Sequence, residues 1–208
     1  MLRRHFPARF APIGRDFFCA RIIVAMNPII WMLIETVGSL FASACVLRAY
    51  AWRVHLNPNN PVSQFVNALT DWLVKPLGRL VKPTRAMDWP SAIAGLLVAL
   101  LVSLLFFVLN GHTPNPGAVL LLGFIWLVRW SLYLMMGIII LMAIISLINP
   151  YAPLAPALNQ MSDPILSPIR RIIPLVGNFD LSPLVAILLI QVLLAFVHPS
   201  SVPMLVGH

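Results

Sequence analysis

Charged residues are scarce in this chain of 208 residues, at 10% of the total, while hydrophobic residues make up 60% and the mean hydropathy is +0.92. Soluble domains ordinarily carry about 25% charged residues. The composition therefore excludes an ordinary soluble domain. It indicates an all-α integral membrane protein, because apolar runs of about 20 residues are typical of transmembrane helices.

The residues that build catalytic and metal centres are also few. The two cysteines, Cys19 and Cys45, form no CxxC or CxxCH motif, and the five histidines are scattered along the chain. The sequence contains no nucleophile beside a base, no glycine-rich phosphate loop, no HExxH motif and no nucleic-acid-binding motif. We therefore expect no enzymatic activity, no metal, no cofactor and no nucleic-acid partner.

Four apolar stretches are candidate transmembrane helices: 29–50, 91–109, 119–148 and 184–197. The fourth is short and the third is long. At about 1.5 Å per residue the third would measure roughly 45 Å, more than a hydrocarbon core of about 30 Å. We expect it to tilt, to break or to begin with an interfacial segment, and Arg129 inside it suggests a break.

A set of six identical residue pairs shares an offset of 92 positions. This common register predicts two repeats, 26–117 and 118–208, each built as span, Asn-Pro, amphipathic loop, aspartate and span. Because each unit holds two spans, the copies are expected to be parallel, related by an axis along the membrane normal. The pairs are Asn57 and Asn149, Pro58 and Pro150, Asp71 and Asp163, Pro76 and Pro168, Arg79 and Arg171, and Asp88 and Asp180.

Residues 1–25 lie outside the repeats and carry five arginines and one aspartate. They are interpreted as a basic leader, either a targeting segment or a tail, or as a start codon assigned too early, with Met26 the favoured start. The loop 51–90 holds five Lys and Arg residues and the loop 149–183 holds two, whereas 110–117 holds none. The positive-inside rule then places both long loops in the cytoplasm, although a retained leader would favour the opposite orientation.

Both long loops carry apolar residues at helical spacing, and each is predicted to form an amphipathic helix whose apolar face lies in the acyl boundary. Prolines are expected to break these helices: Asp163 and Pro164 suit a helix start, and Pro168 removes a backbone donor. Asp88 and Asp180 resemble caps of the spans that follow. The apolar positions are Val62, Phe65, Val66, Leu69, Trp72 and Leu73 in the first loop and Leu154, Leu158, Met161, Ile165 and Ile169 in the second.

The charged residues allow two readings. Those in the loops suit anionic headgroups and topology anchoring, while the repeated pairs Asp71 with Arg79 and Asp163 with Arg171 suggest an internal charge network. Three further charges, Glu35, Arg48 and Arg129, fall in or at the end of spans. A charge at membrane depth is costly unless paired, so Glu35 is a functional candidate with Arg129 as its partner; alternatively, it lies near the outer interface.

The segments "NPVSQFVNALTDWLVKPLGRL", "SDPILSPIRRIIP" and "DLSP" together resemble the YggT (YlmG) family of small bacterial membrane proteins, which has relatives in chloroplasts. The resemblance covers residues 26–197 and implies a multi-pass protein of the bacterial inner membrane. It also implies loose links to osmotic tolerance, ion uptake, cell division and cytochrome assembly, and no catalytic residue. The first copy departs from the motif, with Trp72 in place of Pro164 and Gly78 in place of Arg170, which favours the second copy for function.

Three functions follow as hypotheses. The first is a non-enzymatic scaffold or assembly factor whose cytoplasmic loops contact anionic lipid or a membrane, division or assembly protein. The second is a small transporter or channel component, which with four spans would need a homo-oligomer and which liposome flux would reveal. The third is a cytochrome or haem assembly factor. The candidate contact residues are Asp163, Pro164, Pro168, Arg170, Arg171, Asp180, Asp71, Pro76, Arg79 and Asp88.

Overall fold

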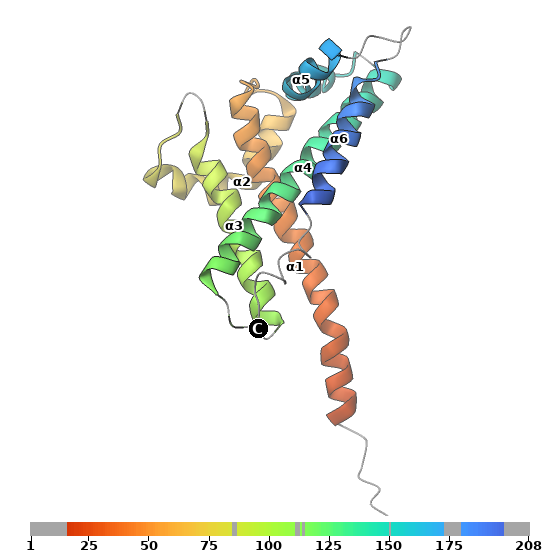
Figure 1. The fold of residues 1–208 in the computed structure, drawn as a ribbon. Helices are drawn as coiled ribbons and strands as arrows, with labels where there is room; N and C mark the ends of the chain where they lie inside the picture. The colour runs from red at the N-terminus through yellow and green to blue at the C-terminus, as the bar shows by residue number, and fades with distance from the viewer. Residues whose placement is uncertain are drawn as a thin grey trace, which may run out of the picture.

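A computed structural model describes residues 16–84, 87–110, 113, 115–149, 151–172 and 180–197, with the backbone alone for 16–28 and Ile172. Six helices follow one another in this part of the chain (Figure 1), which confirms the all-helical class. The first fifteen residues of the predicted leader lie outside the described residues. The helices are α1 (Asp16–Arg53), α2 (Pro61–Leu80), α3 (Trp89–Leu109), α4 (Pro116–Ile148), α5 (Ala155–Ile172) and α6 (Ser182–Phe196).

Three helices are long and apolar enough to cross a bilayer: Ile29–Arg53 within α1, Trp89–Leu109 and Pro116–Ile148. They correspond to the first three predicted spans. The fourth apolar helix, α6, has 15 residues and is therefore about 22 Å long, shorter than a hydrocarbon core. A fourth span at α6 stays a prediction.

The expected break at Arg129 is wrong, because α4 is one continuous helix of 33 residues. The Arg129 guanidinium lies 5.6 Å from the centre of the Tyr133 ring and donates to its hydroxyl at 3.3 Å. The positive charge of Arg129 is thus stabilised by Tyr133, one helical turn further along α4, and the helix continues without interruption. At about 50 Å, α4 exceeds the hydrocarbon thickness, and it runs obliquely across α1 in Figure 1.

The core consists of two main apolar clusters along α4. The N-terminal half of α4, with Trp126 and Trp130, packs against α1 and α3 through Ala42, Ala99 and Val102. The C-terminal half packs against α5, α6 and the end of α1 (Figure 1). The long helix α4 therefore connects the two halves of the molecule.

Both amphipathic helices lie at the C-terminal end of α1. The Tyr50 hydroxyl donates to the Met161 carbonyl at 2.6 Å, and the Gln160 side chain donates to the Val54 carbonyl at 3.0 Å. These contacts connect α5 to the end of α1, from which the chain leads directly into α2. The cytoplasmic orientation of this end stays a prediction.

The proline breaks predicted in the two loops are wrong. Pro76 lies inside the single helix α2, and Pro164 and Pro168 lie inside the single helix α5. Each proline is exposed, so the carbonyl left without a donor one turn earlier lies on the outer side, where water or a headgroup can bond it. Asp163 is consequently inside α5 and caps no helix start.

The predicted placement of the apolar faces in the acyl boundary is also corrected. The apolar side of α5 packs into the bundle, where Leu158 and Met161 are 4% and 1% exposed. In α2 the apolar side is divided, because Val66 is buried whereas Phe65 and Trp72 are 69% and 65% exposed. Both amphipathic helices therefore use apolar residues to pack against the bundle. Of the two, α2 is the one that also exposes large apolar side chains, which lipid could cover.

We predict that Gly123→Ala destabilises the protein by about 1–3 kcal/mol, the usual cost of overpacking. A Cβ at Gly123 would lie 3.2 Å from Leu100 Cα and 3.3 Å from the Ala99 carbonyl oxygen, both backbone atoms of α3. Gly137 on the same helix has nothing within 4 Å of its Cβ position, so Gly137→Ala is the matched control. Thermal unfolding of purified protein in detergent measures both, and equal midpoints would contradict the prediction.

Candidate functional site

A charge cluster joins α1, α2 and the start of α3. Arg48 of α1 donates through Nη1 to Asp71 Oδ1 at 2.8 Å and to Thr70 Oγ1 at 3.0 Å. Its Nε lies 3.6 Å from Asp88 Oδ2, directly before α3, and the Ser91 hydroxyl donates to the same oxygen. One guanidinium thus connects carboxylates from two other segments.

Hydrogen bonds hold Asp71 of this cluster in its charged form, although burial opposes ionisation. The side chains of Arg48 and Asp88 are 21% and 8% exposed. Hydrogen bonds from Lys75 and then from Arg48 lower the pKa of Asp71 below its ordinary value of 3.8. Lys75 Nζ lies 2.8 Å from Asp71 Oδ2, one helical turn along α2. The cluster therefore joins α1 to α2 and to the start of α3.

A second cluster lies between α5 and the start of α6. Arg170 contacts Asp163 at 3.3 Å through Nη1 and Asp180 at 2.9 Å through Nε. Asp180 also accepts a hydrogen bond from the Ser182 amide at 2.9 Å, but the N-cap of α6 is Leu181, so the predicted capping by Asp180 is wrong. Asp88 does occupy the N-cap position of α3, yet its side chain bonds to the Ser91 hydroxyl and not to a backbone amide of the helix. Burial raises the pKa of Asp180, but hydrogen bonds from Ser182 and Arg170 outweigh burial and lower the pKa overall.

The two clusters use equivalent aspartates and unrelated arginines. Asp71 and Asp163, like Asp88 and Asp180, are 92 positions apart. Adding 92 to 48 gives Ile140, and subtracting 92 from 170 gives Gly78, so neither arginine has a basic equivalent. In each half one guanidinium bridges two carboxylates at equivalent positions. The arginine comes from the long helix α1 in the first half and from the amphipathic helix α5 in the second.

The predicted ion pairs of Asp71 with Arg79 and of Asp163 with Arg171 are wrong. Arg79 and Arg171 are exposed and form no ion pair within the part of the chain that the structure describes. A spacing of eight residues rotates a helix by about 80° beyond two full turns, whereas the spacing of seven between Asp163 and Arg170 returns to the same face. Helix geometry therefore selects Arg170 over its neighbour.

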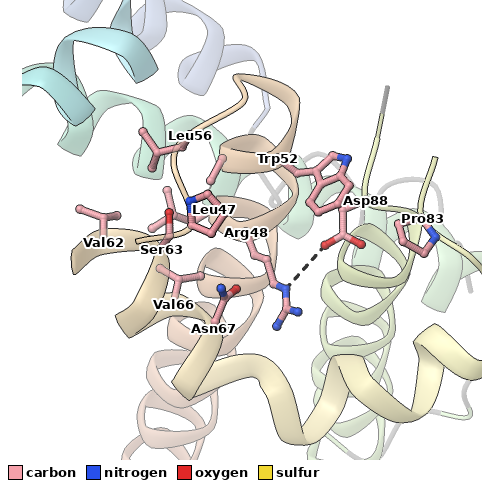
Figure 2. A pocket seen from close by; sticks show the side chains of 12 residues that line it. Leu47, Arg48, Trp52, Leu56, Val62, Ser63, Val66, Asn67, Pro83 and Asp88 are labelled. Carbon is pink, nitrogen blue, oxygen red and sulfur yellow. Dashed lines mark ion pairs between the residues drawn. The ribbon is translucent and has the colours of Figure 1, made fainter. Parts of the chain in front are cut away.

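A pocket of about 200 Å³ opens beside the first cluster, between the end of α1, the first half of α2 and the loop before α3. Figure 2 shows Arg48 and Asp88 facing each other in it, with Trp52 and Pro83 nearby. Ser63 and Asn67 of α2 also line the pocket. The pocket is therefore lined by one basic and one acidic side chain, by neutral polar side chains and by apolar ones.

The proposed partnership of Glu35 with Arg129 is not seen: across the described helices no ion pair involves either residue, and Arg129 contacts Tyr133 instead. Glu35 is half-buried in α1. The candidate residues Pro76, Pro164 and Pro168 are exposed on α2 and α5, and their side chains carry no polar group that could join either cluster. The charge clusters therefore gather Arg48, Asp71, Asp88, Asp163, Arg170 and Asp180 from the candidate residues.

Sequence reasoning missed three contributors to the first cluster and pocket. Lys75 could have been found, since it follows Asp71 by four residues on a helix. Thr70 and Ser63 are polar residues of an amphipathic helix, yet both are buried. Their burial depends on how α2 packs against α1, which the pattern of one helix does not contain.

Comparisons with known proteins find a family and several relatives. The sequence profile described as CCB3/YggT matches residues 26–109 and 121–201. The uncharacterized protein YggT of Escherichia coli K12 is 28% identical over 169 residues, covering 81% of this chain and 88% of that protein. A Vibrio alginolyticus protein, described as an uncharacterized protein in the proC 3′ region, is 28% identical over 162 residues, covering 76% and 88%. No solved structure matches.

We predict that Arg48→Gln destabilises the protein by roughly 2–3 kcal/mol, less than for a fully buried pair because Lys75 still faces Asp71. Arg170→Gln should cost about 1 kcal/mol or less, since Arg170 and Asp163 are 40% and 58% exposed. Chemical unfolding in detergent gives both values. A larger loss for Arg170→Gln would contradict the ranking.

We also predict that the arginine of the first cluster can be moved from α1 to α2, the position that it has in the second half. Arg48→Ile reproduces the Ile140 of the second half, and Gly78→Arg reproduces its Arg170. The Cβ position of Gly78 has nothing within 4 Å, so an arginine can enter there. The double variant should regain most of the stability lost in Arg48→Ile. Gly78→Gln in the same background is the control, and equal rescue by it would refute the exchange.

Proposed function

The chain belongs to the CCB3/YggT family, and we propose that it is a non-enzymatic membrane scaffold or assembly factor that binds a partner protein through the outer face of α5. The outer face of α5 comprises Asp163, Ser167, Arg170 and Arg171, all exposed. The proposal combines this surface with membrane-spanning helices that hold it at one end of the bundle.

The contrast between α2 and α5 carries the proposal. The helix α5 has no exposed large hydrophobic side chain between Ala155 and Arg171, whereas α2 exposes Phe65, Trp72 and Leu80. Trp72 also packs edge-on against Phe41 of α1, with ring centroids 5.8 Å apart. Exposed aromatic rings suit the membrane interface, while a polar helix face suits water or a polar partner.

The charges of the outer face favour a protein partner over a purely anionic membrane. Lipid-binding helices owe their affinity to clustered basic residues. Here Arg170 is engaged by Asp163 and Asp180, which leaves Arg171 beside acidic groups already held in fixed positions. A mixed, rigid set of charges discriminates between partners through electrostatic complementarity.

We infer for the fold a pair of parallel repeats in the bacterial inner membrane, with α2 and α5 on the cytoplasmic side. Support comes from the order of long, amphipathic and apolar helices, which occurs twice, and from the offset of 92. In this arrangement α6, at about 22 Å, spans the bilayer with local thinning.

We predict that a photoreactive residue at Ser167 captures a discrete protein in cells and that Arg171→Glu abolishes this adduct. Arg171 forms no ion pair among the described residues, so its reversal leaves the Asp163–Arg170–Asp180 cluster in place. The matched control is Arg79→Glu, because Arg79 occupies the equivalent, exposed position of α2. Mass spectrometry identifies the adduct; capture of lipid alone, or loss of the adduct in both variants, would sink the proposal.

A further inference from the structure

We propose that the pocket between α1, α2 and α3 binds the headgroup of a bilayer lipid that carries a phosphate ester and a primary ammonium, such as phosphatidylethanolamine. The pocket measures about 200 Å³. This is far more than the space that one buried water needs, so the pocket has room for a small polar group. The site is separate from the outer face of α5.

The donors for a phosphate are already in place. Ser63 and Asn67 line the pocket, and neither side chain forms a hydrogen bond to another described residue. Ser63 is only 8% exposed, so its hydroxyl has little access to solvent outside the pocket. Arg48 commits Nη1 to Asp71 and Thr70, while its Nη2 has no hydrogen bond within the described residues. Hydroxyl, amide and guanidinium donors suit phosphate oxygens.

The acceptor for an ammonium is Asp88. This residue is 6% exposed, and its Oδ2 lies 3.6 Å from Arg48 Nε, longer than a hydrogen bond. An ionised carboxylate has about four acceptor sites, of which the Ser91 hydroxyl uses one. The charged residues in the pocket lining are one arginine and one aspartate, so the lining has no net charge. The Arg48 Nη2 donor and the remaining acceptor positions of Asp88 can both bond to a zwitterion, whereas a simple anion or cation bonds to only one of these two residues.

The position of the pocket favours a lipid over a soluble molecule. Arg48 lies five positions before the end of the span Ile29–Arg53, where headgroups begin. Trp52, 47% exposed, lines the pocket and donates its indole N–H to the Thr84 carbonyl at 3.0 Å, as interfacial tryptophans commonly do. Leu47 and Val62 add apolar lining (Figure 2) for the first carbons of a lipid.

The second half offers a natural comparison. Asn159 and Ala155 are the equivalents of Asn67 and Ser63 at the offset of 92, and both line a cavity of only about 30 Å³. That cavity is several times smaller than the pocket between α1, α2 and α3. Ile140 replaces the arginine there. The equivalent place therefore lacks both the room and the guanidinium, which makes Asn159 a control position.

The test is retention of lipid by the purified full chain, measured by native mass spectrometry after exchange into mixed micelles of phosphatidylethanolamine, phosphatidylcholine and phosphatidylglycerol. We expect selective retention of phosphatidylethanolamine, because the trimethylammonium of phosphatidylcholine donates no hydrogen bond to Asp88. Asn67→Ala, which removes a donor without adding bulk, should lower retention about tenfold, the loss of one good hydrogen bond. Ser63→Leu, which fills the pocket, should abolish it.

Asn159→Ala is the matched control and should leave lipid retention unchanged. Helicity and thermal midpoint confirm that each variant is folded, and Asn67→Ala provides the result where Ser63→Leu does not fold. Equal retention of the three lipids, or retention unaffected by Asn67→Ala in folded protein, would overturn the proposal. Binding of free phosphoethanolamine without retention of the lipid would overturn its assignment to the membrane.

Discussion

In each half of this protein one guanidinium bridges two aspartates. These salt bridges fix how the amphipathic helix meets its neighbouring helices at one end of the bundle. A charge near the hydrocarbon core is costly unless it is paired. Arg48 meets that requirement only if α2 and the start of α3 bring Asp71 and Asp88 to it. The demand for neutralisation therefore fixes an amphipathic helix and the entry to the next apolar helix in a single arrangement.

The equivalence of the aspartates and the exchange of the arginine follow from the same electrostatics. A bridge requires a guanidinium between two carboxylates. The Coulomb energy depends on the distances between these charges and on the surrounding dielectric, not on which helix carries the arginine. The first half brings it from the span as Arg48, and the second from the amphipathic helix as Arg170. The exposure also differs: the side chains of Asp71 and Asp88 are 31% and 8% exposed, whereas those of their equivalents Asp163 and Asp180 are 58% and 31% exposed.

Composition and hydropathy were sufficient to predict the helical membrane class and the three long apolar helices, because these depend on lipid as solvent and on local sequence. They failed at the prolines of α5, where packing of Leu158 and Met161 against the bundle stabilises a helix that local propensity would end. They failed also for the arginine partners. Those pairings depend on helix rotation and on contacts between segments, which an offset in sequence does not encode.

The two halves have diverged in what they enclose. Thr70 in the first half accepts a hydrogen bond from Arg48, while its equivalent Ser162 is 1% exposed and its hydroxyl has no partner among the described residues. The arginine that would reach that hydroxyl is replaced by Ile140. With its guanidinium on α5, the second half places charge outward and retains only a small cavity. If one half binds lipid and the other a protein partner, as we propose, the different position of the arginine is the physical basis of that division.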